Sequence, residues 1–446
     1  MPTESLIAGG LRASGTCLPS PAPTNAAPGS PRKPMSVSLN RPLPPAALGL
    51  LSLLGCCLAS PALADANPYY VGTALNLSHV SNIYRQNNNA NSDRVVSASL
   101  LAGIDQTFGR QRLNLDASLQ ANRYQNNSEL NNRGYTLKGG LDWSTAERLS
   151  GSVKVNNSQS LATYNIGSGI APIFKKNIEK NTAVDAVLRV GLVTKFSAEA
   201  SAGQRSRRFS AVEYSRLEVD QTRYSLGLTY SPSPNLRLGV AGRHTRDRFP
   251  RFTLINLLNA EYQASEFTRK DIDLTGRAVL SGASSIDGRI SHGRSRVKLG
   301  AGNDFNGTTG QLTWTWLPTV RWNIATTLSR DTGLETSFFR VGGNTLNADQ
   351  NRVTTSAQLA VSYELTAKIV LNASASSSRA ERVDDFLGQQ AKSQDRDTAY
   401  SLGARWLYSR SIQLGCQYTK NSRSSTIVQY VYDANSFGCY GQMVLN

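Results

Sequence analysis

Residues 113–122 have the sequence LNLDASLQAN, in which every second side chain is apolar and the intervening ones are polar. Successive residues of a β-strand project to opposite faces, so this segment predicts a strand with one apolar and one polar face. The same alternation recurs in residues 135–144, 224–230, 272–280, 353–363 and 400–408. Because the pattern is repeated along the chain, it predicts an all-β protein.

Two kinds of connection separate these segments. Tight turns are expected near residues 109–110, 145–147, 194–195, 232–235, 282–283, 318–319, 366–367 and 409–410. Longer stretches rich in Asn, Ser and Gly occupy residues 81–93, 125–133, 158–180, 248–266, 333–350 and 381–395. Short turns at one end and long loops at the other are typical of an outer-membrane barrel.

The strand count follows from the turns. Nine hairpins joined by eight tight turns predict a single transmembrane antiparallel β-barrel of about 18 strands, with 16 as the alternative, short periplasmic turns and long extracellular loops. The barrel must close, because an open sheet edge in hydrocarbon would leave backbone N–H and C=O groups unpaired. A soluble sandwich or β-solenoid would leave the loop asymmetry and the export signal below unexplained.

Composition agrees with a membrane barrel. Only 18% of the 446 residues are charged and 39% are hydrophobic, which is low on both counts for a soluble globular protein. Low charge and a small apolar fraction occur together where one face contacts lipid and the other encloses polar space. The 17 Tyr, 12 Phe and 5 Trp argue against disorder.

The N-terminal region predicts export. Met35 and Arg41 precede an apolar run from Ala46 to Ala59, and Ala62-Leu63-Ala64 fits the small-x-small pattern of signal peptidase. We therefore expect a signal peptide over residues 35–64, cleavage between Ala64 and Asp65, and a barrel over residues 65–446. Residues 1–34 are expected to be a disordered extension or an upstream mis-start. The rival interpretation is lipoprotein processing at Cys56, because residues 53–56 resemble a lipobox.

Cysteine usage also fits export. Cleavage before Asp65 leaves Cys416 and Cys439 as the cysteines of the mature chain. An even number in an oxidising compartment predicts one disulfide between them. Both share the apolar phase of the last two predicted strands, so the bond would be a structural cross-strand link, and two free membrane-facing thiols are the alternative.

The formal net charge is +17, so the positions of the basic residues bear on what the protein can bind. They are spread along the chain, which disfavours nucleic acid as a partner. Basic residues on the polar phase of the strands are the candidate pore-lining set: Arg112, Lys138, Arg189, Arg223, Arg237, Arg243, Arg277, Arg289, Arg321 and Arg405. The acids noted in that phase are Asp116, Asp142, Asp185, Asp273 and Asp287.

Two interpretations of this set compete. Rings of basic side chains would favour anions in the lumen. Alternatively, opposite charges on neighbouring strands pair and only stiffen the wall. The excess of basic residues slightly favours the first.

No catalytic or cofactor motif stands out. His79, His244 and His292 lie in separate predicted hairpins without an acid or nucleophile at motif spacing, so they are interpreted as solvated or interfacial, and neither an enzyme, a metal site nor a cofactor is expected. Residues 303–307 contain Asn, Asp and Gly and are interpreted as a turn rather than a calcium loop. Residues 253–263 have helical spacing and are predicted to form a short helix, either plugging the pore or packing against a neighbouring loop.

Three segments carry a resemblance to a known family: residues 67–72 (NPYYVG), the hairpin 224–240 around residues 231–235 (SPSPN), and residues 432–439 (YDANSFGC). With these, the chain resembles the EpsL-type outer-membrane β-barrels encoded with exosortase-associated exopolysaccharide operons. The resemblance spans about the whole mature chain and implies a role in exporting or assembling an extracellular polysaccharide. It marks no binding residues.

Together these observations favour an outer-membrane barrel that passes a polysaccharide through a basic lumen, located in the cell outer membrane. A general small-solute porin and a structural or adhesive barrel with a closed lumen are the alternatives. The expected partners are outer-membrane lipid and lipopolysaccharide, an anionic polysaccharide and periplasmic export components, with no nucleic acid.

Overall fold

The computed structural model describes residues 67–445, apart from 146–147, 166–171, 194, 257–260, 301–303, 333–339, 342–343, 346–351 and 387–388. Its strands are β1 (Tyr69–Val80), β2 (Asp93–Phe108), β3 (Gln111–Tyr124), β4 (Asn132–Ser144), β5 (Leu149–Leu161), β6 (Ile178–Val193), β7 (Phe196–Phe209), β8 (Val219–Ser233), β9 (Leu236–Asn256), β10 (Glu261–Ser281), β11 (Ser284–Leu299), β12 (Phe305–Trp316), β13 (Trp322–Thr332), β14 (Arg340–Val341), β15 (Asn344–Thr345), β16 (Arg352–Glu364), β17 (Ile369–Phe386), β18 (Gln389–Leu407), β19 (Ile412–Ser425) and β20 (Tyr432–Leu445). Short 3-10 helices, η1 (Ser128–Leu130), η2 (Val212–Leu217) and η4 (Val428–Tyr430), lie in the loops. The predicted signal peptide and its cleavage site lie outside the described residues.

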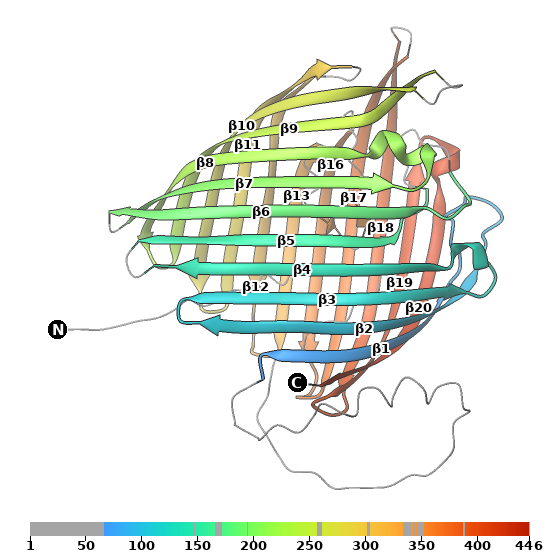
Figure 1. Ribbon diagram of the computed structural model, residues 1–446, viewed down its shortest axis with the longest axis horizontal. Helices are drawn as coiled ribbons and strands as arrows, with labels where there is room; N and C mark the ends of the chain where they lie inside the picture. The colour runs from blue at the N-terminus through green and yellow to red at the C-terminus, as the bar shows by residue number, and fades with distance from the viewer. Residues whose placement is uncertain are drawn as a thin grey trace.

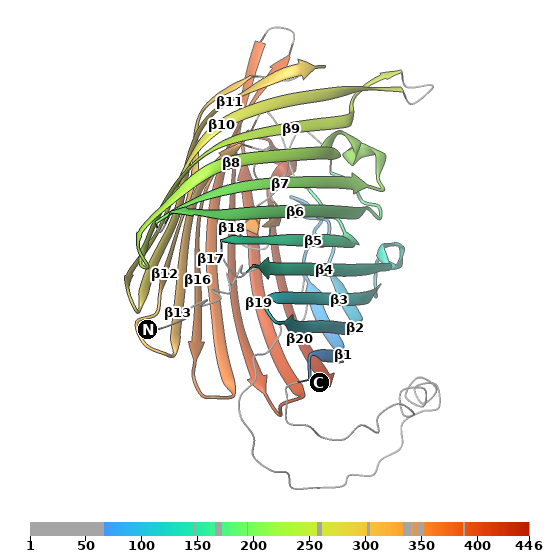
Figure 2. The same ribbon diagram turned by 60° about the vertical axis from the view of Figure 1, so that its left-hand side comes forward.

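The sheet closes on itself. An 18-stranded antiparallel sheet links each strand to the next, with β13 paired to β16 because β14 and β15 form a separate small hairpin. The first and last strands pair from Val71↔Leu445 to Val80↔Ser436, which joins the two edges of the sheet. Figures 1 and 2 show the resulting wall of tilted strands. The predicted 18-stranded antiparallel barrel is confirmed.

Tight turns connect the described strands where the sequence predicts them, although residues 146–147 and 194 of two predicted turns lie outside the described residues. β2 ends at Phe108 and β3 begins at Gln111, so Gly109 and Arg110 form the turn. Gly109 has a φ of 61°, a left-handed conformation that costs glycine little because it has no Cβ. These turns gather at one end of the barrel and the longer loops at the other (Figure 1).

Two predicted loops are wrong. Residues 248–256 and 261–266 extend β9 and β10, and residues 381–386 and 389–395 extend β17 and β18, so both connections are far shorter than predicted. Polar side chains suggested loops there, but the backbone ladder continues beyond the apolar band. Phe249 and Phe267 are buried together in the first extension, which stabilises it.

The predicted helix over residues 253–263 is also wrong. Leu254 pairs with Tyr262, and Thr253 with Gln263, in the β9–β10 ladder. A short apolar run is compatible with the period of a helix or of a strand, and here the residues pair as strands. The described residues contain no helix long and apolar enough to cross a membrane.

The outer face of the barrel is apolar. Large exposed hydrophobic residues follow the outward register, for example Leu226 and Leu228 on β8, and Ile272 and Leu274 on β10. Rings gather near the tight turns, where Phe196 stacks on Tyr230, Trp314 on Trp316, and Trp322 lies against Tyr363. Aromatic rings prefer the interfacial depth of a bilayer, so this end marks one boundary of the lipid-facing band.

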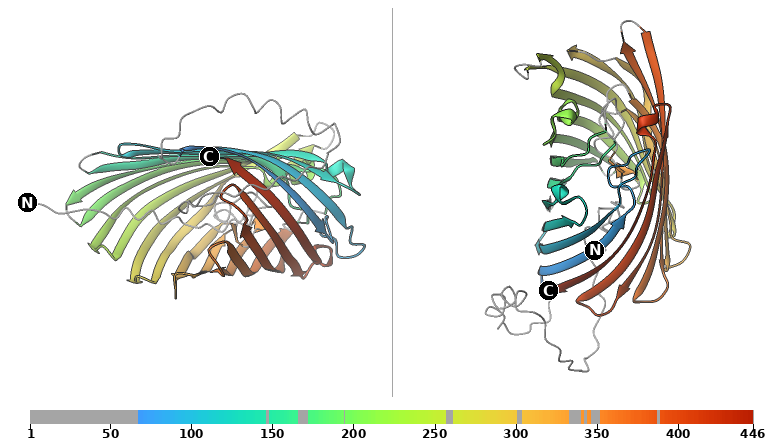
Figure 3. Two further views of the ribbon diagram at one scale, coloured as in Figure 1. Left: turned by 90° about the horizontal axis from the view of Figure 1, so that it is seen from below. Right: turned by 90° about the vertical axis from the view of Figure 1, so that its right-hand side faces the viewer.

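A second row of rings marks the other boundary. Tyr224 lies on the outward face of β8 six residues before Tyr230, and Tyr400 lies six residues before Trp406 on β18. Six residues span about 20 Å along a strand. That length, together with the rings themselves, matches the apolar band of an outer-membrane barrel. Figure 3 shows the same strands from below and from the side.

A disulfide links the last two strands. Cys416 on β19 and Cys439 on β20 are directly opposite each other and are bonded, and both lie on the outward register with Leu414 and Phe437. The bond therefore lies on the lipid-facing side of the wall, next to the β20–β1 pairing that closes the barrel.

Replacing both cysteines by alanine should lower the free energy of unfolding by about 3 kcal/mol, because the bond closes a loop with a sequence separation of 23. Urea unfolding of the barrel refolded in lipid vesicles would measure the change. Adding a reductant to the native chain should reproduce the loss. Equal stability of the native and alanine proteins would show that the bond contributes nothing to barrel stability.

Candidate functional site

The inward register of the strands forms the lumen wall. Side chains that alternate with the lipid-facing ones are mostly Ser, Thr, Asn, Gln and charged residues, as in Ser97 on β2 and Gln358 on β16. At the loop end, inward residues meet loops that fold into the mouth. Arg423 of β19, for example, donates through Nη1 to the backbone oxygen of Asn165 at 2.8 Å.

The predicted pore-lining residues are placed by the register. Nine of the ten lie on the inward face of their strands: Arg112, Lys138, Arg189, Arg223, Arg237, Arg243, Arg277, Arg289 and Arg405. The placement of Arg321 on a strand is wrong. β13 begins at Trp322, so Arg321 is the last residue of the turn between β12 and β13, where its backbone oxygen accepts from the N–H of Glu364 at 2.9 Å.

Inward charges nearly balance among the regularly paired strand residues whose side chains the structure describes, which leaves out Arg251 and Glu261 at the irregular end of the β9–β10 pairing. The inward bases are Arg112, Lys138, Lys154, Arg189, Arg205, Arg207, Arg223, Arg237, Arg243, Arg269, Arg277, Arg289, Arg405 and Arg423. The inward acids, one more in number, are Asp93, Asp105, Asp116, Asp142, Glu179, Asp185, Glu199, Asp247, Asp271, Asp273, Asp287, Asp331, Glu364, Asp395 and Asp397.

Many of these charges pair across the wall. Arg112 lies opposite Asp142 and contacts Asp105 at 2.5 Å, and Arg189 lies opposite and contacts Glu199 at 2.5 Å. Opposite charges on neighbouring strands attract each other, so this pattern favours the paired-wall interpretation over a basic lumen. The sequence analysis missed several inward acids. Asp395, for example, fell in a predicted loop that is in fact a strand.

The excess positive charge lies on the outward face instead, on the loop side of the apolar band. The outward bases there are Arg94, Arg123, Arg133, Lys180, Arg208, Arg246, Arg248, Lys270, Arg294, Arg296, Arg330, Arg379, Arg396 and Lys420. Outward acids at the same level on the described strands are few, namely Asp220, Glu266, Glu381 and Asp433. This belt of bases surrounds the barrel where its outer surface meets lipid headgroups.

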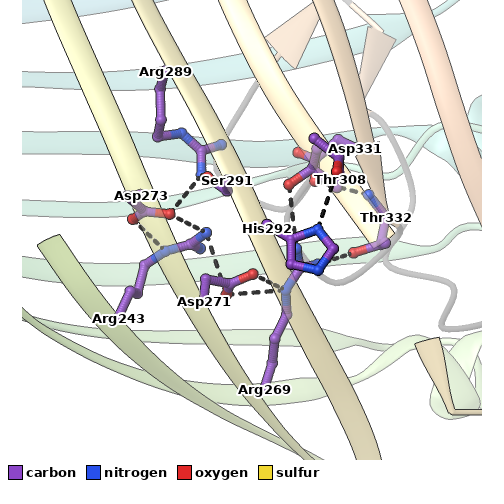
Figure 4. Close-up of polar contacts among 11 residues, drawn as sticks. Arg243, Arg269, Asp271, Asp273, Arg289, Ser291, His292, Thr308, Asp331 and Thr332 are labelled. Carbon is purple, nitrogen blue, oxygen red and sulfur yellow. Dashed lines mark hydrogen bonds and ion pairs between the residues drawn. The ribbon is translucent and has the colours of Figure 1, made fainter. Parts of the chain in front are cut away.

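A buried cluster of charges crosses the lumen wall on β9, β10 and β11. Figure 4 shows its members, which we call the wall ladder: Arg243, Arg269, Asp271, Asp273 and Arg289. Arg243 Nε lies 2.8 Å from Asp273 Oδ2, and Arg243 Nη2 lies 3.3 Å from Asp271 Oδ2. Arg269 Nε lies 2.8 Å from Asp271 Oδ1. The guanidinium of Arg289 approaches Asp273 at 3.8 Å.

Hydroxyl groups complete the wall ladder. Arg269 donates through Nη1 to Thr332 Oγ1 at 2.7 Å and through Nη2 to Thr309 Oγ1 at 3.2 Å, while Arg289 donates to Ser291 Oγ at 2.7 Å. A buried charge is costly unless it is paired and hydrogen-bonded, and here both conditions are met. The cluster is therefore a rigid polar segment of the lumen wall spanning β9 to β13.

The barrel mouth is partly covered by loops with a core of their own. Tyr84, Leu130, Tyr164 and Tyr214 come from the β1–β2, β3–β4, β5–β6 and β7–β8 connections and are buried in one cluster. Burial raises the pKa of Tyr84, Tyr164 and Tyr214, so these phenols stay protonated at neutral pH. Four loops that are separate in sequence thus act as one packed unit.

A hydrogen-bonded bridge joins this unit to the far strands. Asn165 Nδ2 donates to the backbone oxygens of Arg85 at 2.5 Å and Gln429 at 3.2 Å, in the loops after β1 and β19. With the Arg423 contact, we call this arrangement the mouth bridge. β6 and β19 are separated along the wall by six intervening strands through β20 and β1, so the bridge crosses a sector of the mouth.

Buried amide and carboxylate side chains hold the loops, and the sequence analysis missed them. Asp93 accepts hydrogen bonds from the backbone N–H groups of Gln125, Asn126 and Asn127 at 2.9 to 3.0 Å. Asn177 Oδ1 accepts from the N–H of Ala211 at 3.0 Å. Asx residues that flank strands are ordinary loop signals, so only their burial distinguishes these two.

The three histidines lie on the outward register. In the strand ladders His79 pairs with Phe437, His244 with Tyr224, and His292 with Thr308. The Nδ1 atom of His292 lies 3.1 Å from the Oγ1 atom of Thr308. The histidines face the interfacial zone rather than the lumen. The part of the chain that the structure describes contains no group of three or more His, Cys, Asp or Glu residues that could hold a metal ion.

A closed antiparallel barrel with an apolar outer face and a polar, charged inner face is an outer-membrane β-barrel, because only closure satisfies the backbone in lipid. The protein belongs to that class and is located in the outer membrane.

No protein-family model and no curated protein matches the sequence. Among solved structures, the outer membrane protein opdK from Pseudomonas aeruginosa is similar, with a TM-score of 0.44 and 11% identity over 84% of this chain and 98% of that chain. OccK2 (OpdF) from Pseudomonas aeruginosa is similar with a TM-score of 0.46 and 10% identity over 84% and 98%. Acinetobacter baumannii OccAB3 is similar with a TM-score of 0.43 and 11% identity over 84% and 99%.

Proposed function

We propose that this protein is a passive channel for small hydrophilic solutes. Barrels of this strand number enclose an aqueous lumen, and this one presents paired charges and hydroxyl groups to it. The observation that supports the proposal best is the near balance of inward acids and bases. A wall of that kind can hydrogen-bond solutes of either sign while favouring neither.

The mouth supports the same conclusion. The packed loops and the mouth bridge cover a sector of the entrance, which limits the size of what can enter. Polysaccharide export, the leading expectation from the sequence, depended on a basic lumen, and the excess of bases lies outside the barrel. The resemblance to EpsL-type barrels stays a prediction. It is now the one observation that supports polysaccharide export as the alternative function.

Single-channel recording of residues 65–446 in planar bilayers tests the proposal. We expect a steady conductance with a cation-to-anion permeability ratio within about threefold of one, because inward charges nearly balance. Small sugars should enter liposomes through the protein, and added acidic polysaccharide should not block the current. A strongly anion-preferring current blocked by polysaccharide would contradict the proposal and support export.

Neutralising inward acids should change the ion preference. Replacing Asp105, Asp116 and Asp142 by asparagine leaves their basic partners uncompensated, so the permeability ratio should shift toward anions severalfold. The matched control replaces the outward bases Arg396 and Lys420 by glutamine, which should leave the ratio unchanged. An equal shift in both variants would show that these inward residues do not line the ion path.

A further inference from the structure

The outer wall of the barrel contains an apolar groove over β4 to β10. Its volume is about 800 Å³. The outward residues along its floor are small, namely Ala186, Ala200, Ala202 and Gly242. Larger outward side chains flank the floor: Trp143, Leu188, Tyr224 and Leu226. Most of the lining lies on the lipid-facing register, and the rest, Ser152, Val187, Ser201, Ser225, Arg243 and Asp271, belongs to the inward register of the same strands. The bulky outward side chains therefore border a hollow that opens toward hydrocarbon.

Basic residues lie directly above the groove. Tyr224, His244, Lys270 and Arg294 form one row of directly paired outward positions on β8 to β11, and His244 and Lys270 also line the groove. Arg246 and Arg296 lie in the next outward row toward the loops, with Arg248 one row beyond. The apolar hollow therefore ends at a patch of positive charge, at the level of the lipid headgroups.

The acids on this surface are already engaged. Arg208 contacts Asp220 at 2.7 Å, Arg246 contacts Glu266 at 2.7 Å, and Arg294 contacts Asp304 at 3.7 Å. Lys270, Arg248 and Arg296 are bases in excess of these pairs. A patch that keeps a net positive charge beside hydrocarbon attracts an anion that has an apolar tail.

We propose that the groove and the basic rows form a binding site for one phosphate-bearing lipid of the outer leaflet. An acyl chain lies along Ala200, Ala202 and Gly242, and the phosphate contacts Lys270 and Arg296. A second copy of this chain fits the surface poorly, because a two-fold interface would bring the same basic rows together. The site is independent of the channel proposed above.

Gly242 offers a specific test. A Cβ added at Gly242 would meet no atom within 4 Å, so leucine fits there without disturbing the wall and occupies the groove. Gly276 is the matched control: it is also outward-facing, its added Cβ would lie 3.7 Å from Leu238, and it is not part of the groove. Lys270→Glu tests the phosphate contact, with Lys420→Glu as the control on the far wall.

The experiment measures binding of bis-phosphorylated lipid A to the detergent-solubilised barrel by native mass spectrometry. We expect one tightly retained lipid per barrel. Lys270→Glu should weaken it about fivefold or more, the effect expected for one basic residue near an anionic surface. Gly242→Leu should weaken it to a similar extent, because its side chain occupies the place of the acyl chain. Gly276→Leu and Lys420→Glu should leave the affinity unchanged, and conductance should be the same in all four variants.

Several results would overturn the proposal. Unchanged affinity in Gly242→Leu would exclude an acyl chain in the groove, and equal binding of dephosphorylated lipid A would exclude phosphate recognition. Equal weakening by the control variants would show an unspecific attraction to the whole belt. Displacement of the lipid by inorganic phosphate alone would indicate a free-anion site, and a dimer lost in Gly242→Leu would identify a second copy as the occupant.

Discussion

Replacing Arg269 by methionine is expected to destabilise the barrel by about 3 kcal/mol, because one partner of a buried ion pair is removed. The Arg269 side chain is 1% exposed and that of Asp271 is 0% exposed. Methionine keeps most of the volume, so the cost comes from the carboxylate of Asp271, which loses the closer of its two basic partners. Urea unfolding in lipid vesicles would measure it.

An exposed pair on the same wall provides the control. Arg112 contacts Asp105 at a similar distance, but its side chain is 53% exposed, so Arg112→Met should cost less than about 1 kcal/mol. Adding Asp271→Asn to Arg269→Met should recover part of the stability, since the buried charge is then gone. Equal costs for the two arginines would mean that burial does not set the strength of the wall ladder.

Replacing Asn165 by glycine should release the mouth bridge. The amide of Asn165 makes two hydrogen bonds to other loops, and losing both favours the released loop by about 2 kcal/mol, or roughly 30-fold in population. The released loop should raise the mean single-channel conductance and add fluctuations between open levels. Planar bilayer recording would show both.

The backbone conformation separates the two contributions at this residue. Asn165 has a φ of 45°, which glycine adopts freely, whereas alanine is strained there by about 1 kcal/mol. Asn165→Ala should therefore release the loop further than Asn165→Gly. Asn131→Gly, in the β3–β4 loop, is the control and should leave the conductance unchanged. Native conductance in both Asn165 variants would show that the bridge does not restrict the entrance.

Local pattern sufficed for the scaffold. Alternation in residues 113–122 predicted β3, and a turn at Gly109 and Arg110 predicted where the chain reverses. Both depend on neighbours in sequence, because side-chain direction has a period of two along a strand and turn residues act locally. The prediction of long loops failed because it ignored long-range contacts. The extension of β9 and β10 depends on Phe249 packing against Phe267, a contact that local polarity does not reveal.

The closed barrel and its lipid-facing residues could be predicted from the sequence, because they follow from a repeating local pattern and the need to satisfy the backbone in lipid. The sequence left 16 or 18 strands, and a disulfide or two free thiols, as alternatives, and the structure has 18 strands and the disulfide. The charge of the lumen wall, by contrast, depends on long-range pairing. Whether Arg243 or Arg269 presents a free charge depends on which acid lies beside it on the next strand, and strand register sets that. The same holds for Asn165, whose partners are 80 and 264 residues away along the chain.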